Sequence, residues 1–165
     1  MVRRKRSGFT LTEAVITVAI LGIVSSISAK IMIQANRYFI LTRTRRDLQG
    51  EARGVMYVIT RNLREAQNAT ITIDRLSTSQ PFCSRITFTK IQGTTMTFEQ
   101  SGNQLIQVVG GKSHTLSKNL RYLAFSFPRS DDMTIVSVSM TLEEGIFQGQ
   151  KKALHMASEK VEVMN

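Results

Sequence analysis

The sequence predicts an α+β protein in which one long amino-terminal helix is followed by a mostly antiparallel β-sheet. Residues 9–29 form an apolar run, and residues 30–68 repeat apolar side chains at helical intervals without a proline. After residue 69 the pattern changes to an alternation of polar and apolar residues, which is typical of half-buried strands. A chain of 165 residues has room for an anchor and one modest core.

The chain begins with a short basic segment, residues 1–8, that ends in glycine. Its cations are Arg3, Arg4, Lys5 and Arg6. Positive charge in front of an apolar span holds that end in the cytoplasm. We therefore predict a cytoplasmic leader over residues 1–8 and delivery of the rest of the chain across the membrane.

The apolar segment that follows, residues 9–29, is long enough to cross a membrane as a helix. Its 21 residues would rise about 31 Å, close to the thickness of a hydrocarbon core. Glu13 is the single charge in this segment. Because a lone carboxylate in hydrocarbon is costly, Glu13 is interpreted as a functional group that needs a partner.

Residues 30–68 predict an amphipathic continuation of the same helix. The segment contains only two glycines, Gly50 and Gly54, each less favourable in a helix than alanine by about 1 kcal/mol. Charged side chains occupy the other faces of the helix. We predict one helix from residue 9 to about residue 68. The apolar or small positions of its amphipathic half are Tyr38, Leu41, Leu48, Ala52, Val55, Ile59, Leu63 and Ala66.

Residues 69–165 predict the β-rich domain. Two alternating segments, 95–99 and 104–109, flank the turn residues 101–103 and predict a hairpin. Residues 151–165 are compatible either with a short helix or with an edge strand. The other segments with strand alternation are 70–74, 85–90, 120–127 and 134–142.

The formal net charge of +10 indicates an anionic partner, either nucleic acid or a membrane. Cations next to a membrane span contact lipid phosphates. We therefore expect a membrane as a partner and do not expect nucleic acid as the main one. Part of the positive charge lies in the leader. Another part lies just beyond the apolar run, at Arg37, Arg43, Arg45 and Arg46.

The sequence predicts no enzyme, cofactor or metal site. It lacks a Gly-x-Ser-x-Gly elbow, a phosphate-binding glycine loop and the paired spacing of a metal centre, and its histidines are isolated. Its one cysteine, Cys83, excludes an internal disulfide. Asp131 and Asp132 are interpreted as a solvated turn, with a calcium-ligand role as the alternative.

Two ordinary interpretations compete for the amino-terminal stretch. A cleaved signal peptide fits the basic start, and small residues precede Ala29. Glu13 at the head of the apolar run and the helical pattern beyond Ala29 oppose it. A plain single-pass anchor explains length and orientation but leaves Gly8, Phe9 and Glu13 without a role.

Residues 8–23, GFTLTEAVITVAILGI, resemble the cleavage and methylation motif of type IV prepilins and type II secretion pseudopilins. The resemblance implies a pilin-like fold and a membrane prepilin peptidase that cuts between Gly8 and Phe9. It also implies methylation of the new amino terminus at Phe9. Glu13 matches the glutamate that, in this family, is thought to pair with the free amino terminus of a neighbouring subunit.

The resemblance implies a structural subunit of the bacterial inner membrane, with a cytoplasmic amino terminus, that joins a filament after processing. The expected partners are the prepilin peptidase, other major and minor pilins or pseudopilins, and an inner-membrane assembly platform. Residues 63–66 (LREA) and 161–165 (VEVMN) resemble J-type or W-type minor subunits. Lys30 stands near where many pilins carry a helix-kinking proline.

The function expected from the resemblance is that of a minor subunit in a type II secretion pseudopilus or a type IV pilus-like filament that moves protein across the envelope. The alternative is a minor pilin for DNA uptake or adhesion, in which basic residues bind nucleic acid or surfaces. Either way, a separate ATPase would supply the energy, because no nucleotide-binding motif is present.

Overall fold

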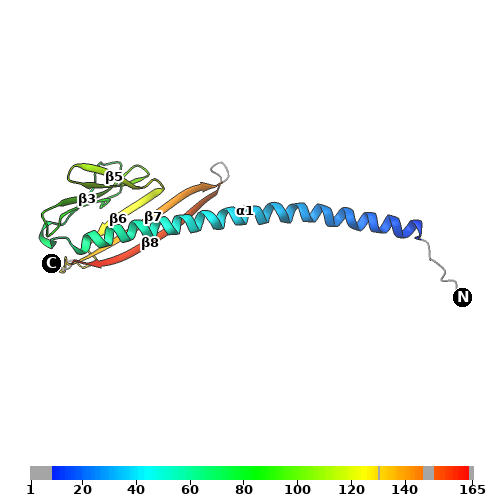
Figure 1. The fold of residues 1–165 in the computed structure, drawn as a ribbon, viewed down its shortest axis with the longest axis horizontal. Helices are drawn as coiled ribbons and strands as arrows, with labels where there is room; N and C mark the ends of the chain where they lie inside the picture. The colour runs from blue at the N-terminus through cyan, green and yellow to red at the C-terminus, as the bar shows by residue number, and fades with distance from the viewer. Residues whose placement is uncertain (1–8, 130, 147–150, 164–165) are drawn as a thin grey trace. The chain divides into compact units, whose positions relative to one another are not determined.

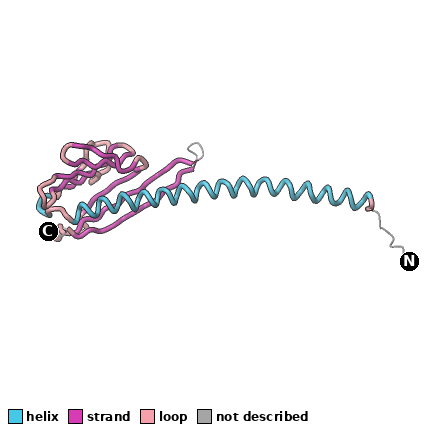
Figure 2. Tube along the Cα trace, in the orientation of Figure 1, coloured by secondary structure: helices cyan, strands magenta, loops and turns pink. Residues whose placement is uncertain are grey.

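The computed structural model describes residues 9–129, 131–146 and 151–163, and it confirms the predicted α+β class. One long helix, α1 (Leu11–Arg64), precedes all the strands (Figures 1 and 2). The chain divides into two compact units, with the boundary between Ile40 and Leu41. After α1 the elements are η1 (Asn68–Thr70), β1 (Thr72–Asp74), β2 (Arg85–Thr89), β3 (Thr95–Ser101), β4 (Gln104–Val109), β5 (Lys112–Ser117), β6 (Leu120–Ser126), β7 (Ile135–Ile146) and β8 (Lys151–Glu162).

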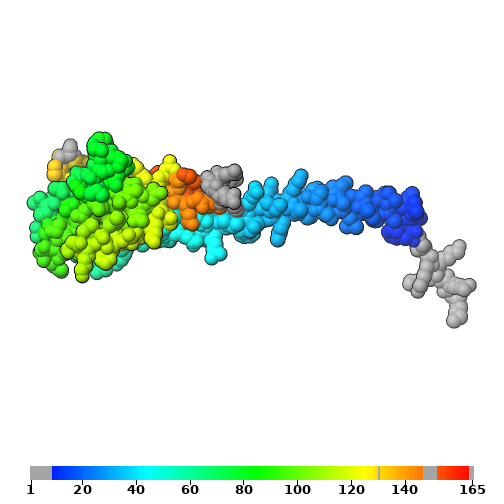
Figure 3. All heavy atoms as spheres, turned by 90° about the horizontal axis from the view of Figure 1, so that it is seen from above, coloured from blue at the N-terminus to red at the C-terminus, as the bar shows by residue number. Residues whose placement is uncertain are grey.

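The first unit consists, in its described part, of the apolar stretch of α1. An 18-residue window of this helix has a mean hydropathy of 2.1, and none of it is buried within the protein. By length and composition this helix is able to cross a membrane. The side chains of this stretch project around the helix (Figure 3), and its large apolar side chains are exposed.

The second unit is built on one face of the carboxyl-terminal half of α1. From Leu48 onward the side chains at helical spacing on this face are buried against the strands, as the amphipathic pattern predicted. Tyr38, at the start of the predicted pattern, is exposed. The predicted end of the helix, at about residue 68, is wrong. The backbone N–H of Gln67 donates to the Thr89 carbonyl at 2.9 Å, so this stretch pairs with β2 instead of continuing the helix. The helix residues that enter the core are Leu48, Ala52, Val55, Met56, Ile59 and Leu63.

The first sheet contains five antiparallel strands in the order β1-β2-β3-β4-β5. The predicted hairpin is confirmed, because Ser101 pairs with Gln104 across a two-residue loop. Alternate side chains of β2 and β3 enter the core, and Phe88 stacks on Phe98 with 6.1 Å between ring centroids. Full burial of one such side chain contributes about 1.5–3 kcal/mol.

The second sheet contains three antiparallel strands in the order β6-β7-β8. Strands β7 and β8 pair along their whole length, from Ile135 opposite Glu162 to Ile146 opposite Lys151 (Figure 1). Of the two structures that residues 151–165 allowed, the edge strand is the one formed over residues 151–162. This sheet therefore ends at β8.

A buried glutamine joins the two sheets. The Gln100 side chain on β3 is only 5% exposed, and its Oε1 accepts a hydrogen bond from the Leu123 N–H at 3.0 Å. Its Nε2 donates to the carbonyls of Gly102 and Arg121, at 3.0 and 3.3 Å. Because the buried amide is satisfied on both sides, Gln100 links β3 to β6 without leaving an unpaired polar group in the core.

Candidate processing and assembly site

The predicted processing site lies at the edge of the described structure. The leader cations Arg3, Arg4, Lys5 and Arg6, together with Gly8, lie outside the described residues. Phe9 on the other side of the predicted bond is described, and its side chain is 70% exposed. The residue predicted to become the new amino terminus therefore precedes the helix, and most of its side chain is exposed.

Thr10 determines where the helix starts. Its carbonyl accepts the first helical hydrogen bond, from the Ala14 N–H at 3.1 Å. Its hydroxyl Oγ1 accepts a hydrogen bond from the Glu13 N–H at 3.3 Å. This is the N-cap half of a capping box, in which a Thr precedes a Glu by three residues. The helix consequently begins at Leu11, not at Phe9 as predicted, and a Thr-x-x-Glu signal for this start was present in the sequence.

Glu13 occupies the first turn of α1, where the partial positive charge of the helix amino terminus favours a carboxylate. The side chain is exposed, and no described cation forms an ion pair with it. Its backbone is thus fully used in starting the helix, while its carboxylate is available to a group outside the described chain.

Three hydroxyl side chains in the apolar stretch are satisfied within the helix. Thr17, Ser26 and Ser28 each donate a hydrogen bond to a backbone carbonyl three or four residues earlier, at 2.8 Å in every case. A hydroxyl bonded in this way enters hydrocarbon at lower cost than an unpaired one. These polar residues are therefore compatible with a helix that crosses a membrane.

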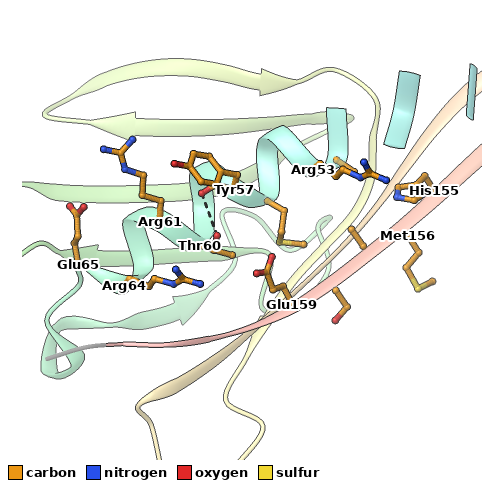
Figure 4. Close-up of a pocket in the computed structure, with 13 residues that line it drawn as sticks. Arg53, Tyr57, Thr60, Arg61, Arg64, Glu65, His155, Met156 and Glu159 are labelled. Carbon is orange, nitrogen blue, oxygen red and sulfur yellow. Dashed lines mark hydrogen bonds between the residues drawn. The ribbon is translucent and has the colours of Figure 1, made fainter. Parts of the chain in front are cut away.

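A second candidate site lies within the second unit, in a groove of about 770 Å³ between α1 and β8 (Figure 4). Arg53, Tyr57 and Arg61 line it from the helix, and His155 and Glu159 line it from the strand. The sequence did not reveal this groove, because residues 151–165 are compatible with either a helix or a strand. Only the pairing of β8 with β7 places the strand beside the helix.

The ion pairs of the second unit lie at its surface and tie elements together. Lys90 donates from Nζ to Glu65 at 2.9 Å, and this hydrogen bond holds the pKa of the Glu65 carboxyl below its usual value. Glu143 on β7 pairs with Lys152 and Arg121, and hydrogen bonds from both lower the pKa of the Glu143 carboxyl.

Asp131 and Asp132 serve the turn before β7. Asp131 pairs with Arg129 at 2.9 Å, and Asp132 accepts a hydrogen bond from the Thr134 N–H at 2.9 Å. The hydroxyl and the backbone N–H of Thr134 together lower the pKa of the Asp132 carboxyl. In the described part of the chain, no three His, Cys, Asp or Glu side chains gather closely enough to hold a metal ion.

The comparison with protein families identifies the amino-terminal segment. Residues 3–29 match the family described as the prokaryotic N-terminal methylation motif. No curated protein and no solved structure matched the chain. With a long helix packed on antiparallel sheets, the chain combines this motif with a pilin-like α+β fold.

The motif is that of type IV prepilins and pseudopilins, and it supports the type IV pilin-like protein that the sequence predicted. It implies processing by a prepilin peptidase and assembly with other pilins, and it points to a structural subunit. Together with the exposed apolar helix it indicates membrane anchoring. The match ends at residue 29 and does not distinguish J-type from W-type subunits.

Proposed function

We propose that this protein is a minor structural subunit of a type II secretion pseudopilus or of a type IV pilus-like filament that moves protein across the bacterial envelope. The observation that carries the proposal is the methylation motif over residues 3–29, placed at the start of an exposed apolar helix. The chain would lie in the inner membrane with residues 1–8 in the cytoplasm. Residues 9–29 would span the bilayer, and residues 30–68 and 69–165 would form the periplasmic part.

Processing would occur between Gly8 and Phe9. Glycine has no side chain to hinder the approach of a protease to the backbone. The exposure of Phe9 supports its modification by the same enzyme, because most of the side chain is uncovered in the described chain. The leader cations Arg3, Arg4, Lys5 and Arg6 would hold the uncut segment on the cytoplasmic side, where the peptidase acts.

Glu13 would favour assembly by pairing with the methylated amino terminus of a neighbouring subunit. A charge at the centre of a membrane helix costs about 2.5–3.5 kcal/mol, and this cost falls toward the helix ends. Because Glu13 lies in the first turn, the helix dipole offsets part of its burial. A cationic amino terminus from a neighbour would offset the remainder, so the subunit is more stable in the filament than alone.

Substitution of Gly8 tests the proposal. Gly8→Ala places a methyl group beside the predicted bond, and we expect the full-length chain to accumulate uncut in cells that contain the peptidase. Intact-mass spectrometry of the purified protein measures both the loss of residues 1–8 and the added methyl group. Ser7→Ala is the matched control and is expected to be processed and methylated normally.

A shortened, methylated product from Gly8→Ala would contradict processing at this bond. A wild-type protein that retains residues 1–8 in the presence of the peptidase would contradict the proposed role as a whole.

A further inference from the structure

The groove between α1 and β8 lies beside the part of β8 that brings no large apolar side chain to the core. On β7, Val138 and Met140 are fully buried. Their partners on β8 are Glu159 and Ala157, which are charged or small. Elsewhere β8 does reach the core, through Ala153 and Val161. Between these two residues, Ala157 and Glu159 line the groove beside the helix.

The outer edge of β8 is a second feature of the same place. The strand runs from Lys151 to Glu162 and, among the described strands, pairs only with β7. Within the described residues, no backbone hydrogen bond joins another strand to the edge of β8 that faces away from β7. A long edge strand of this kind presents unpaired N–H and C=O groups to which another extended chain adds as a strand.

The helix side of the groove carries three arginines, Arg53, Arg61 and Arg64. Arg53, Tyr57 and Arg61 follow one another at intervals of four residues and therefore lie on one helix face, with Arg64 nearby. Figure 4 shows Arg53 and His155 at one end of the groove, and Arg61, Arg64 and Glu65 at the other. Among the described ion pairs, none uses Arg53 or Arg64.

The charge of the groove is positive overall. Three arginines face two acids, Glu65 and Glu159. Glu65 is already paired with Lys90, whose Nζ lies 2.9 Å from Glu65 Oε2. Among the described ion pairs none involves Glu159, the other acid of the groove. The excess therefore favours a negatively charged occupant and opposes a second copy of the same basic surface.

The dimensions of the groove suit a short extended segment. From Arg53 to Arg61 the helix rises about 12 Å. From His155 to Glu159 a strand extends about 13 Å. An extended segment of about five residues would lie along both and would place alternate side chains toward the helix.

We propose that the groove between α1 and β8 binds an extended acidic segment of a different protein chain, which adds to β8 as a further strand with its carboxylates facing Arg53, Arg61 and Arg64. The inference builds on the proposed function, in which the chain assembles with other subunits in a filament. It adds the surface of contact and the chemistry of the partner segment.

Peptide binding to the full chain in non-ionic detergent micelles tests the proposal. The probe is a fluorescein-labelled peptide of alternating glutamate and threonine, and binding is measured by fluorescence anisotropy. We expect it to bind at least about tenfold more tightly than the same peptide with glutamine in place of glutamate. Equal binding of the two peptides would overturn the proposal.

The arginines are tested by a matched pair of double variants. Arg53→Gln with Arg64→Gln is expected to weaken binding about tenfold, because both side chains are exposed in the groove and carry its free charge. Lys112→Gln with Lys118→Gln removes the same charge from exposed positions elsewhere and is expected to leave binding unchanged. Equal weakening by both pairs would show general charge attraction and overturn the site. Circular dichroism of each variant checks that it is folded.

Strand addition is tested separately with two N-methylated peptides. One is methylated on the backbone nitrogens of its odd-numbered residues and the other on those of its even-numbered residues; these are the two phases. We expect one phase to bind about tenfold more weakly, because its N–H groups no longer reach β8. Unchanged binding in both phases would overturn strand addition. Self-association of the protein that is abolished in the Arg53 and Arg64 double variant would also overturn the proposal. A single-stranded oligonucleotide that binds the same arginines more tightly than the glutamate peptide would overturn it as well. Since none of these measurements depends on cleavage at Gly8, failure here leaves the proposed processing intact.

Discussion

Glu13 has an observed role in the helix cap and a proposed role in pairing with a neighbouring subunit. Its backbone N–H bonds to Thr10 at 3.3 Å as part of the helix cap, and a polar side chain at this position of a capping box is favoured as either Glu or Gln. Pairing with a cationic amino terminus needs the charge, which only Glu carries. Glu13→Gln therefore separates the two roles, because glutamine suits the capping box but carries no charge.

At the residue scale we predict that Glu13→Gln and Glu13→Ala both insert into the membrane and both fail to assemble. The physical reason is that either change removes the carboxylate while leaving the apolar helix intact. Crosslinking in cells to other pilin-like subunits, followed by immunoblotting, measures assembly, and we expect crosslinked product to fall to background. Thr12→Ala in the same turn is the control and should crosslink normally.

An assembling Glu13→Gln beside a failing Glu13→Ala would contradict the pairing role. It would assign Glu13 to the capping box alone.

At the element scale, the β3–β4 hairpin was predictable because its signals are local. The β3–β4 hairpin followed from strand alternation around residues 101–103, and the register through Ser101 and Gln104 agrees with it. The end of α1 was not predictable in this way. Glu65 and Ala66 still suit a helix, but hydrogen bonds to residues 89–91, far along the chain, end it at Arg64.

The two-residue loop of this hairpin supports a prediction about backbone strain. Gly102 has a φ of 58°, and a Cβ added there would meet nothing within 4 Å. Gly102→Ala should therefore destabilise the protein by about 1–2 kcal/mol through backbone conformation alone. Urea unfolding of the full chain in micelles, followed by far-UV circular dichroism, measures the free energy of unfolding.

Gly102→Asn is the matched control, since asparagine tolerates positive φ better than alanine, and it should lose less stability. Equal losses for Ala and Asn would contradict an origin in the sign of φ and would point to lost turn contacts.

At the scale of the whole molecule, surface charges tie distant segments of the second unit together. Lys90 near β2 holds Glu65 at the end of α1, and Arg121 on β6 joins Lys152 on β8 through Glu143 on β7. The pKa of the Glu65 carboxyl and the pKa of the Glu143 carboxyl are both lowered, in each case first by the hydrogen bond from a lysine.

These shifts predict how stability changes with pH. A lowered folded-state pKa means that the unfolded chain binds more protons than the folded chain in the acidic range. The stabilisation is therefore complete above the ordinary carboxyl pKa of about 4.3 and is lost as pH falls below it. We expect the urea midpoint of the full chain in micelles to fall between neutral pH and pH of about 3.

Glu143→Gln should flatten this dependence because it removes one of the shifted carboxyls. Glu144→Gln, at the neighbouring exposed position, is the control and should keep the wild-type profile. A wild-type profile in Glu143→Gln would contradict the contribution of the Arg121 and Lys152 pairs.

The sequence by itself determined the amino-terminal motif, the apolar length of the helix, the amphipathic face from Leu48 to Leu63 and most strands, because these depend on residue type and spacing along a short stretch. Only the tertiary structure decided the end of α1 at Arg64, the strand over residues 151–162 and the basic groove beside it. Each of these depends on hydrogen bonds or packing between residues far apart in the chain. Local propensity left their conformation undecided, and the pairing of β8 with β7 and of residues 66–67 with residues 89–90 selected it.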